Sequence, residues 1–258
     1  MTSSGAAGSL PRAFPRQRFL TACAWGVHLY TALGAALGLL AIFFASRGDF
    51  RASFLAMGVA TIIDCTDGPL ARWLMVKIRV PTFDGALLDN IVDYLTYTVA
   101  PVFLMLAAGI IPESRWGLAL ACFVMLASIY GFCHTEAKTP DNYFLGFPNY
   151  WNLVAFYLFC LGAGTVFNVA VLMLLAVMVF MPLKYIYPNR TVPLRPITLT
   201  LGVAWGVLTI VSVLILPAVN PIMLWAGLSF IAYYFIASFV LHARAALRSS
   251  RIRADRNG

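Results

Sequence analysis

Long apolar segments constrain the fold of this 258-residue chain more than any other feature of its sequence. A run of ~20 apolar residues is long enough to cross the hydrocarbon core of a bilayer as a helix. Such runs recur along the whole chain, in which 61% of the residues are hydrophobic and 11% are charged. A soluble domain carries roughly 25% charged residues. The sequence therefore predicts an all-α, polytopic membrane protein.

The apolar segments are separated by short polar stretches, and we expect eight membrane-spanning helices. They cover residues 22–46, 52–76, 84–110, 115–136, 148–164, 166–187, 198–216 and 220–242. Residues 1–19 are then a mobile or interfacial cytoplasmic segment, residues 20–243 the transmembrane domain, and residues 244–258 a basic tail. An even number of crossings places both termini on one side of the membrane.

The basic residues support this topology. Every Lys and Arg except Arg47, Arg51 and Arg115 falls on the side of the termini. Positive charge accumulates on the cytoplasmic side of membrane proteins, so we expect both termini to be cytoplasmic. Arginines beside a membrane span commonly bind anionic lipid headgroups, and we therefore expect a lipid bilayer rather than nucleic acid as the partner.

Half of the acidic residues lie in one short stretch of this apolar chain. The chain has ten Asp and Glu residues in total. The five in this stretch are Asp64, Asp67, Asp84, Asp89 and Asp93. A carboxylate inside a membrane is energetically costly and normally faces a partner or a water-filled site.

The spacing of four of these aspartates brings them together. Asp64 and Asp67 are three residues apart, and Asp89 and Asp93 are four apart, so each pair shares one helix face. A short connection joins the two helices and makes them antiparallel neighbours. The four carboxylates would repel one another without a cation, and hard oxygen ligands suit Mg²⁺ or Mn²⁺.

Other residues of the same stretch suit a phosphate group. Gly68 and Gly85 allow close approach of a ligand, and Arg72 supplies a planar cationic group. From the residues alone, a catalytic metal site, the cation pathway of a transporter and a structural group of buried aspartates all remain open. Asp84, directly before Gly85, is either a helix N-cap or a further site residue.

The pattern Asp64-x-x-Asp67-Gly68-x-x-Ala71-Arg72, followed by Gly85-x-x-x-Asp89-x-x-x-Asp93, resembles the signature of the CDP-alcohol phosphatidyltransferase family. Twelve residues separate Arg72 from Gly85, which is a longer spacer than is usual in the family. The longer spacer resembles the bacterial branch that uses choline as the acceptor. Further similarity to that branch lies in the stretches VHLYTALGA, LLDNIVDYLTY, TEAKTPDNYFLGFPNYWN and YPNRTVPLRP.

The resemblance implies an enzyme that transfers the phosphatidyl group of CDP-diacylglycerol to an alcohol and releases CMP. Its fold would be a six-helix core with two further helices. The four aspartates Asp64, Asp67, Asp89 and Asp93 would hold Mn²⁺ or Mg²⁺, as a pair of ions. Asp93, assisted by Asp89, would act as the general base on the incoming hydroxyl.

The resemblance also implies a nucleotide pocket. Its residues would be Thr31, Gly68, Ala71, Arg72 and Gly85. His28 stands where many members of the family have an asparagine, three residues before the retained threonine.

Choline as the acceptor requires aromatic or acidic surroundings for its trimethylammonium group. The candidates for the choline pocket are Glu136, Tyr150, Trp151, Tyr94 and Tyr97. These aromatic residues are equally compatible with an ordinary interfacial belt. Lys184 and Arg190 are candidates for contact with a lipid phosphate, or alternatively anchor a helix end.

The family resemblance implies a bacterial inner-membrane location with a cytoplasmic active site. A homodimer is a possible assembly. The alternatives are a phosphatidyltransferase for serine or glycerol phosphate, and a divalent-cation transporter.

Overall fold

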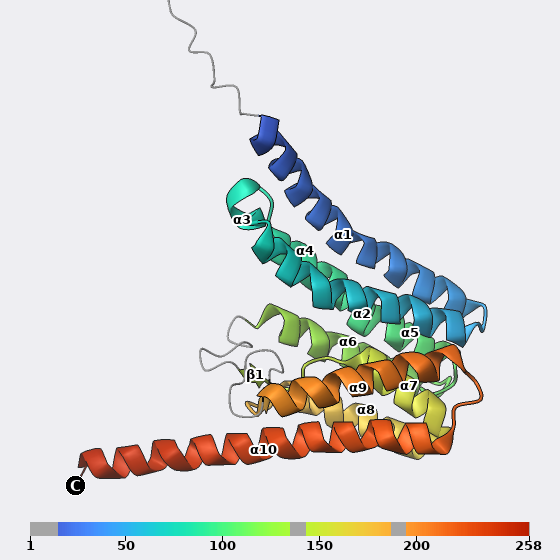
Figure 1. The fold of residues 1–258 in the computed structure, drawn as a ribbon. Coiled ribbons are helices and arrows are strands. Elements are labelled where there is room, and N and C mark those ends of the chain that lie inside the picture. The colour runs from blue at the N-terminus through green and yellow to red at the C-terminus, as the bar shows by residue number, and fades with distance from the viewer. Residues whose placement is uncertain (1–14, 135–142, 187–194, 258) are drawn as a thin grey trace, which may run out of the picture.

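A computed structural model describes residues 15–134, 143–186 and 195–257 of the chain. Within these residues the chain is almost entirely helical, and its helices pack side by side in a bundle (Figure 1). The helices are α1 (Pro15–Ser46), α2 (Phe50–Trp73), α3 (Val76–Arg79), α4 (Gly85–Asp93), the π-helical turn η1 (Tyr94–Val99), α5 (Ala100–Ala107), α6 (Arg115–Cys133), α7 (Trp151–Leu161), α8 (Thr165–Val179), α9 (Arg195–Leu214) and α10 (Pro221–Asn257). The strands are β1 (Tyr143–Leu145) and β2 (Lys184–Ile186).

Six helical stretches of the described chain are long and apolar enough to cross a bilayer. They are Arg16–Ser46, Phe50–Trp73, Gly85–Ala107, Arg115–Cys133, Pro196–Leu214 and Pro221–Ala243. The third of these stretches joins α4, η1 and α5 into one continuous rod. The prediction of an all-α, multi-pass membrane protein is confirmed.

The expected count of eight crossings is not confirmed. The fifth and sixth predicted segments contain α7 and α8, which have 11 and 15 residues. These lengths fall short of the ~20 residues that a helix needs to cross the hydrocarbon core. Irregular chain and the strand β2 occupy most of the rest of these segments, and β1 lies just before the first of them. The strands pair antiparallel, with Phe144 opposite Tyr185.

The ends of the helices follow from local sequence signals. Gly48, with a φ of 75°, makes the turn between α1 and α2. The Asp49 side chain then accepts a hydrogen bond from the Ala52 N–H at 3.0 Å and caps α2. Ser114 caps α6 in the same way, through the Gly117 N–H at 3.1 Å. These short connections make α1 and α2 antiparallel, and likewise α5 and α6.

Two features of the bundle position the aspartates. The helix α1 packs along α2 and also against α4, η1 and α5. The short helix α3 lies against α1 through a small apolar cluster that includes Val27, Val76 and Val80. Together these contacts hold the connection between α2 and α4 at one end of the bundle.

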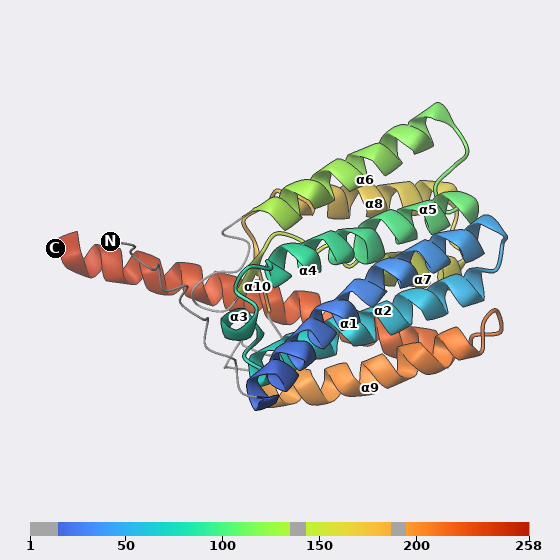
Figure 2. The same ribbon diagram turned by 90° about the horizontal axis from the view of Figure 1, so that it is seen from above.

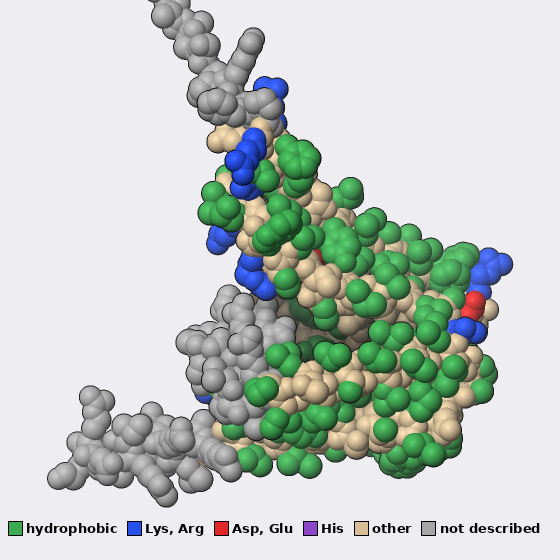
Figure 3. All heavy atoms as spheres, in the orientation of Figure 1, with side chains coloured by type: hydrophobic (Ala, Val, Ile, Leu, Met, Phe, Trp, Pro, Cys, Tyr) green, Lys and Arg blue, Asp and Glu red, His purple; other side chains and the backbone are tan. Residues whose placement is uncertain are grey.

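The start of α1, the helix α3 and the far end of α10 all lie at the same end of the bundle (Figures 1 and 2). The turns between α1 and α2 and between α9 and α10 lie at the opposite end. Apolar side chains cover the visible side of the bundle, and the Lys and Arg side chains gather at its two ends (Figure 3). This distribution is the one expected of a protein whose sides contact lipid.

Candidate active site

Three of the predicted metal ligands converge between α2 and α4. Asp64, Asp89 and Asp93 each offer one carboxylate oxygen, and these oxygens lie within 4.8 Å of one another. Oxygens that share one Mg²⁺ at ~2.1 Å are at most about 4.2 Å apart, so small side-chain rotations suffice to bind an ion. A set made only of carboxylate oxygens is the donor chemistry that Mg²⁺ and Mn²⁺ prefer. The residues present therefore fit a divalent cation.

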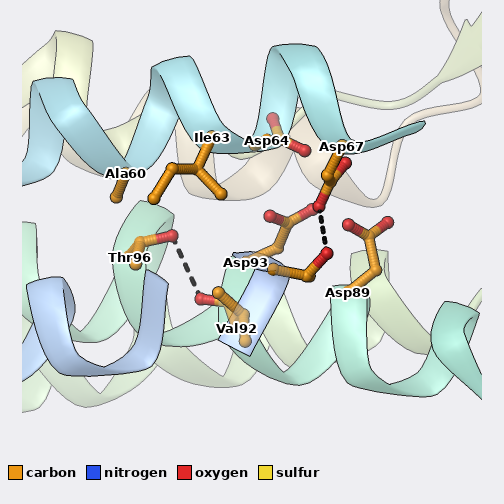
Figure 4. A pocket seen from close by; sticks show the side chains of 9 residues that line it. Ala60, Ile63, Asp64, Asp67, Asp89, Val92, Asp93 and Thr96 are labelled. Atoms are coloured by element: carbon orange, nitrogen blue, oxygen red, sulfur yellow. Dashed lines mark hydrogen bonds between the residues drawn. The ribbon is translucent and has the colours of Figure 1, made fainter. Parts of the chain in front are cut away.

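The fourth predicted ligand, Asp67, lines the same cavity but is not in this group of three. Its side chain is 6% exposed, and its Oδ2 accepts a hydrogen bond from the Thr31 hydroxyl at 2.7 Å. Figure 4 shows this hydrogen bond and the four carboxylates facing one another across the gap between the helices. The cavity is lined by Thr31, Ala60, Ile63, Asp64, Asp67, Asp89, Val92, Asp93 and Thr96.

The fifth aspartate of the stretch has a structural role. Asp84 precedes α4, and its Oδ1 accepts hydrogen bonds from the Ala86 and Leu87 N–H groups, both at 3.0 Å. It is therefore the N-cap of α4, one of the two roles expected from the sequence. This cap fixes the residue at which α4 begins. The start of the helix in turn helps to set the face of α4 on which Asp89 and Asp93 point toward α2.

The two predicted glycines lie at close contacts. A Cβ atom at Gly68 would lie 3.3 Å from a guanidinium nitrogen of Arg72, one turn further along α2. A Cβ at Gly85 would lie 2.7 Å from Cε1 of His28, too close to be accommodated without movement. The exposed Arg72 and the partly buried Ala71 follow on the same helix, beside the small apolar cluster under α3. All five predicted nucleotide-pocket residues thus lie on α1, α2 and the start of α4.

His28 on α1 contacts the first residue of α4 and the connection that precedes this helix. Its side chain is 7% exposed, its ring lies 4.5 Å from the Phe83 ring and 5.8 Å from the Trp25 ring, and it contacts Gly85. Its Nε2 is buried and has no hydrogen-bond partner within the described parts of the chain. The imidazole is thus held by ring contacts one turn before Thr31, the residue of α1 that lines the aspartate cavity.

Tyr94 and Tyr97 both lie on η1, directly after Asp93, but their hydroxyls face different partners. The Tyr97 hydroxyl donates to Oδ2 of Asp64 at 2.7 Å. The Tyr94 hydroxyl donates to the Met125 carbonyl of α6 at 3.4 Å. The sequence did not predict the contact with Asp64. Its only signal is that Tyr97 follows Asp93 by four residues, a spacing that places both on one helix face.

The remaining candidates for the choline pocket differ in their surroundings. Tyr150 is partly buried, and its ring lies 6.3 Å from the Tyr97 ring. Trp151 is fully buried in the main apolar core, and its Nε1 donates to the Ser128 hydroxyl at 2.7 Å. Glu136 lies outside the described residues.

The candidates for a lipid-phosphate contact are placed only in part. The Lys184 ammonium lies 5.4 Å from the centre of the Tyr143 ring, in a cation–π contact between the two strands. Arg190 lies outside the part of the chain that the structure describes.

Comparison with known proteins gives a consistent result. A sequence profile of the CDP-alcohol phosphatidyltransferase family matches residues 28–183. Phosphatidylcholine synthase of Legionella pneumophila is 34% identical over 84% of this chain and 87% of its own length. Phosphatidylcholine synthase of Mesorhizobium japonicum is 39% identical over 76% of this chain and 73% of its own. Phosphatidylcholine synthase of Pseudomonas aeruginosa is 35% identical over 82% of this chain and 88% of its own.

Proposed function

The chain belongs to the CDP-alcohol phosphatidyltransferase family, and on this premise we propose that it is a phosphatidylcholine synthase that transfers the phosphatidyl group of CDP-diacylglycerol to choline. The products are phosphatidylcholine and CMP. The observation that carries this function is the convergence of Asp64, Asp89 and Asp93 inside the matched region.

The cavity between α2 and α4 is where we place the reacting phosphate. A divalent cation, when bound, neutralises negative charge on the diphosphate and on the departing CMP. Asp64, Asp67, Asp89 and Asp93 are the residues that would hold Mn²⁺ or Mg²⁺, as a pair of ions. Arg72 is exposed at the end of α2 and supplies a second positive group for the diphosphate.

The acceptor hydroxyl must lose a proton as it attacks the phosphorus atom. Asp93 lines the cavity from α4, and we assign it the role of general base, with Asp89 one turn earlier on the same face. A carboxylate placed in this way accelerates such a reaction by ~10²–10⁴-fold. The acceptor proton passes to Asp93 and the negative charge leaves with CMP.

The surface of α4 suits a lipid substrate. Leu87 and Ile91 lie on the face of this helix that points away from Asp89 and Asp93, and they are 56% and 60% exposed. Both side chains lie in a span that faces lipid, so the two acyl chains can stay in the membrane while the diphosphate enters the cavity. We therefore place the entrance for CDP-diacylglycerol beside α4, in the leaflet at the end of the bundle that carries α3. We assign that end to the cytoplasmic side of a bacterial inner membrane.

The acceptor is the point on which related enzymes differ. Incubating the purified protein with CDP-diacylglycerol and choline, serine or glycerol phosphate, followed by mass spectrometry of the lipid product, tests the proposal. Phosphatidylcholine is expected from choline alone. A product from serine or glycerol phosphate but not from choline would contradict the choline assignment.

A further inference from the structure

The hydroxyl of Tyr97 binds one of the three clustered carboxylates. Its Oη donates to Oδ2 of Asp64 at 2.7 Å, the short distance of a charge-assisted hydrogen bond. The tyrosine is 8% exposed, so water competes little for this bond. The contact joins the third membrane span to α2 at the level of the cavity.

The backbone places this hydroxyl by an unusual turn. Residues Tyr94–Val99 form a π-helical turn between α4 and α5, and the Ala100 N–H donates to the Leu95 carbonyl five residues back. The wider turn shifts the following side chains around the helix axis relative to a regular α-helix. Turns of this kind are rare and frequently occur at functional sites.

We propose that Tyr97 is a positioning residue that fixes the orientation of the Asp64 carboxylate for metal binding. A hydrogen bond to one oxygen restricts rotation of the carboxylate about its Cβ–Cγ bond. The oxygens of Asp64 are thereby directed toward Asp89 and Asp93 across the gap between α2 and α4. Removing a group that hydrogen-bonds to a metal ligand and orients it commonly lowers metal affinity by about 10–100-fold.

The placement of Tyr97 favours a role in orienting Asp64 over a role in lining the choline pocket. The polar atom of the side chain faces Asp64, and the ring is almost fully covered. Tyr94, three residues earlier on the same turn, directs its hydroxyl to the Met125 carbonyl instead. The two tyrosines therefore form a matched pair in which only one hydroxyl contacts a carboxylate of the cluster.

The test compares Tyr97→Phe with Tyr94→Phe in purified protein reconstituted in nanodiscs. Mn²⁺ affinity is measured directly, by electron paramagnetic resonance of the free ion in the absence of both substrates. Tyr97→Phe is expected to weaken Mn²⁺ binding by about 10–100-fold. Tyr94→Phe is expected to leave the Mn²⁺ affinity unchanged.

Activity gives a second, independent measurement. With Tyr97→Phe the Mn²⁺ concentration for half-maximal turnover should rise by the same factor, and the choline KM at saturating Mn²⁺ should stay unchanged. An unaltered Mn²⁺ affinity together with a raised choline KM would overturn the proposal and place Tyr97 in the choline pocket.

The double variant Asp64→Asn/Tyr97→Phe separates this role from a general contribution to folding. If Tyr97 acts through Asp64, removing its hydroxyl in the Asp64→Asn background should not change Mn²⁺ affinity further. A further loss there would overturn the proposal. The double variant also remains informative if Tyr97→Phe alone does not fold, because it no longer places a charged carboxylate opposite the missing hydroxyl.

The inference rests on the proposed transferase function only for its activity measurement. If the protein made a lipid other than phosphatidylcholine, the choline assignment would fail while the difference in Mn²⁺ affinity would stand. An unchanged Mn²⁺ affinity in an active phosphatidylcholine synthase would contradict the role of Tyr97 alone.

Discussion

The hydroxyl of Thr31 on α1 lies 2.7 Å from Oδ2 of Asp67 on α2, and both side chains are buried. The bond connects the first helix of the bundle to the carboxylate that stands next to the three clustered ones. The same hydroxyl lies 3.3 Å from the Val27 carbonyl one turn earlier on α1, and Thr31 is 7% exposed. The contact therefore fixes α1 and Asp67 relative to each other.

Thr31→Val keeps the shape of the side chain but removes this hydrogen bond. A bond to a charged group contributes ~1.5–3 kcal/mol, so activity should fall by roughly 10–100-fold. Thr31→Ser restores the hydroxyl and should recover most of the activity. Equal activities of the valine and serine variants in the choline transfer assay would contradict a role for the hydrogen bond.

Asp93→Asn and Asp64→Asn should differ in what they lose. Asp93→Asn should lower turnover by ~10²–10⁴-fold and retain most CDP-diacylglycerol binding, because the general base is lost. Asp64→Asn should instead lower metal and nucleotide affinity together. Measurements of substrate binding give the affinity, and single-turnover experiments give the rate of the chemical step. If Asp93→Asn turned over substrate as fast as the wild-type protein at every pH, the assignment of Asp93 as the general base would be refuted.

Chelation tests the metal role of the carboxylates. EDTA should stop the reaction, and Mn²⁺ or Mg²⁺ should restore it, because hard cations suit oxygen ligands. Zn²⁺ should not restore it. The measurement is phosphatidylcholine formation by metal-stripped protein with each ion added back, and full activity without added metal would rule out the role.

The contact of Gly85 with His28 predicts a pair of compensating substitutions. A Cβ at Gly85 would lie 2.7 Å from Cε1 of His28, so Gly85→Ala must displace the imidazole at a cost of ~1–3 kcal/mol. CMP affinity and melting temperature should both fall. Adding His28→Ala removes the steric conflict, and the melting temperature of the double variant should exceed that of Gly85→Ala.

Gly58 on α2 provides the control for this experiment. Apart from its chain neighbours and the adjacent backbone of α2, no atom of the described residues lies within 4 Å of the position that its Cβ would take. Gly58→Ala should therefore leave CMP affinity unchanged and stabilise the helix by up to ~1 kcal/mol. A loss of CMP affinity as large as that of Gly85→Ala would show that the effect does not come from the contact with His28.

The choline pocket is tested by Tyr150→Ala, Glu136→Gln and Trp151→Ala. A lost cation–π contact costs ~0.5–2 kcal/mol, so Tyr150→Ala should raise the choline KM by up to about thirtyfold and leave CDP-diacylglycerol affinity unchanged. Trp151 is fully buried, and its truncation should also lower stability by ~3–5 kcal/mol. If none of the three variants changes the choline KM, Tyr94 becomes the next candidate.

Much of the site could be predicted from the sequence because its geometry is local. Asp64 and Asp67 share a helix face by their spacing, as do Asp89 and Asp93, and the short connection through α3 makes these two helices neighbours. Asp84 likewise caps α4 through N–H groups two and three residues away. Such relationships depend on helix periodicity and not on the rest of the fold.

The remaining features depend on contacts between distant parts of the chain. The lengths of α7 and α8 could not be read from hydropathy, because an apolar run has the same composition whether it is helical or irregular. The pairing of Phe144 with Tyr185 joins two three-residue strands that carry no periodic signal. The contact of Tyr97 with Asp64 joins residues 33 positions apart and lies at a π-helical turn, which has no sequence signature of its own.

The placement of the carboxylates affects how the protein is inserted into the membrane during synthesis. The stretches Phe50–Trp73 and Gly85–Ala107 both have a mean hydropathy of 1.3, whereas the four other long stretches reach 1.8 to 2.1. An aspartate at the centre of a span opposes insertion by the translocon by ~2.5–3.5 kcal/mol, and less toward its ends. The two helices that carry the chemistry are thus the least able to partition into lipid alone. Their entry into the membrane is favoured when they leave the translocon as a hairpin, with the more apolar α1 already in place.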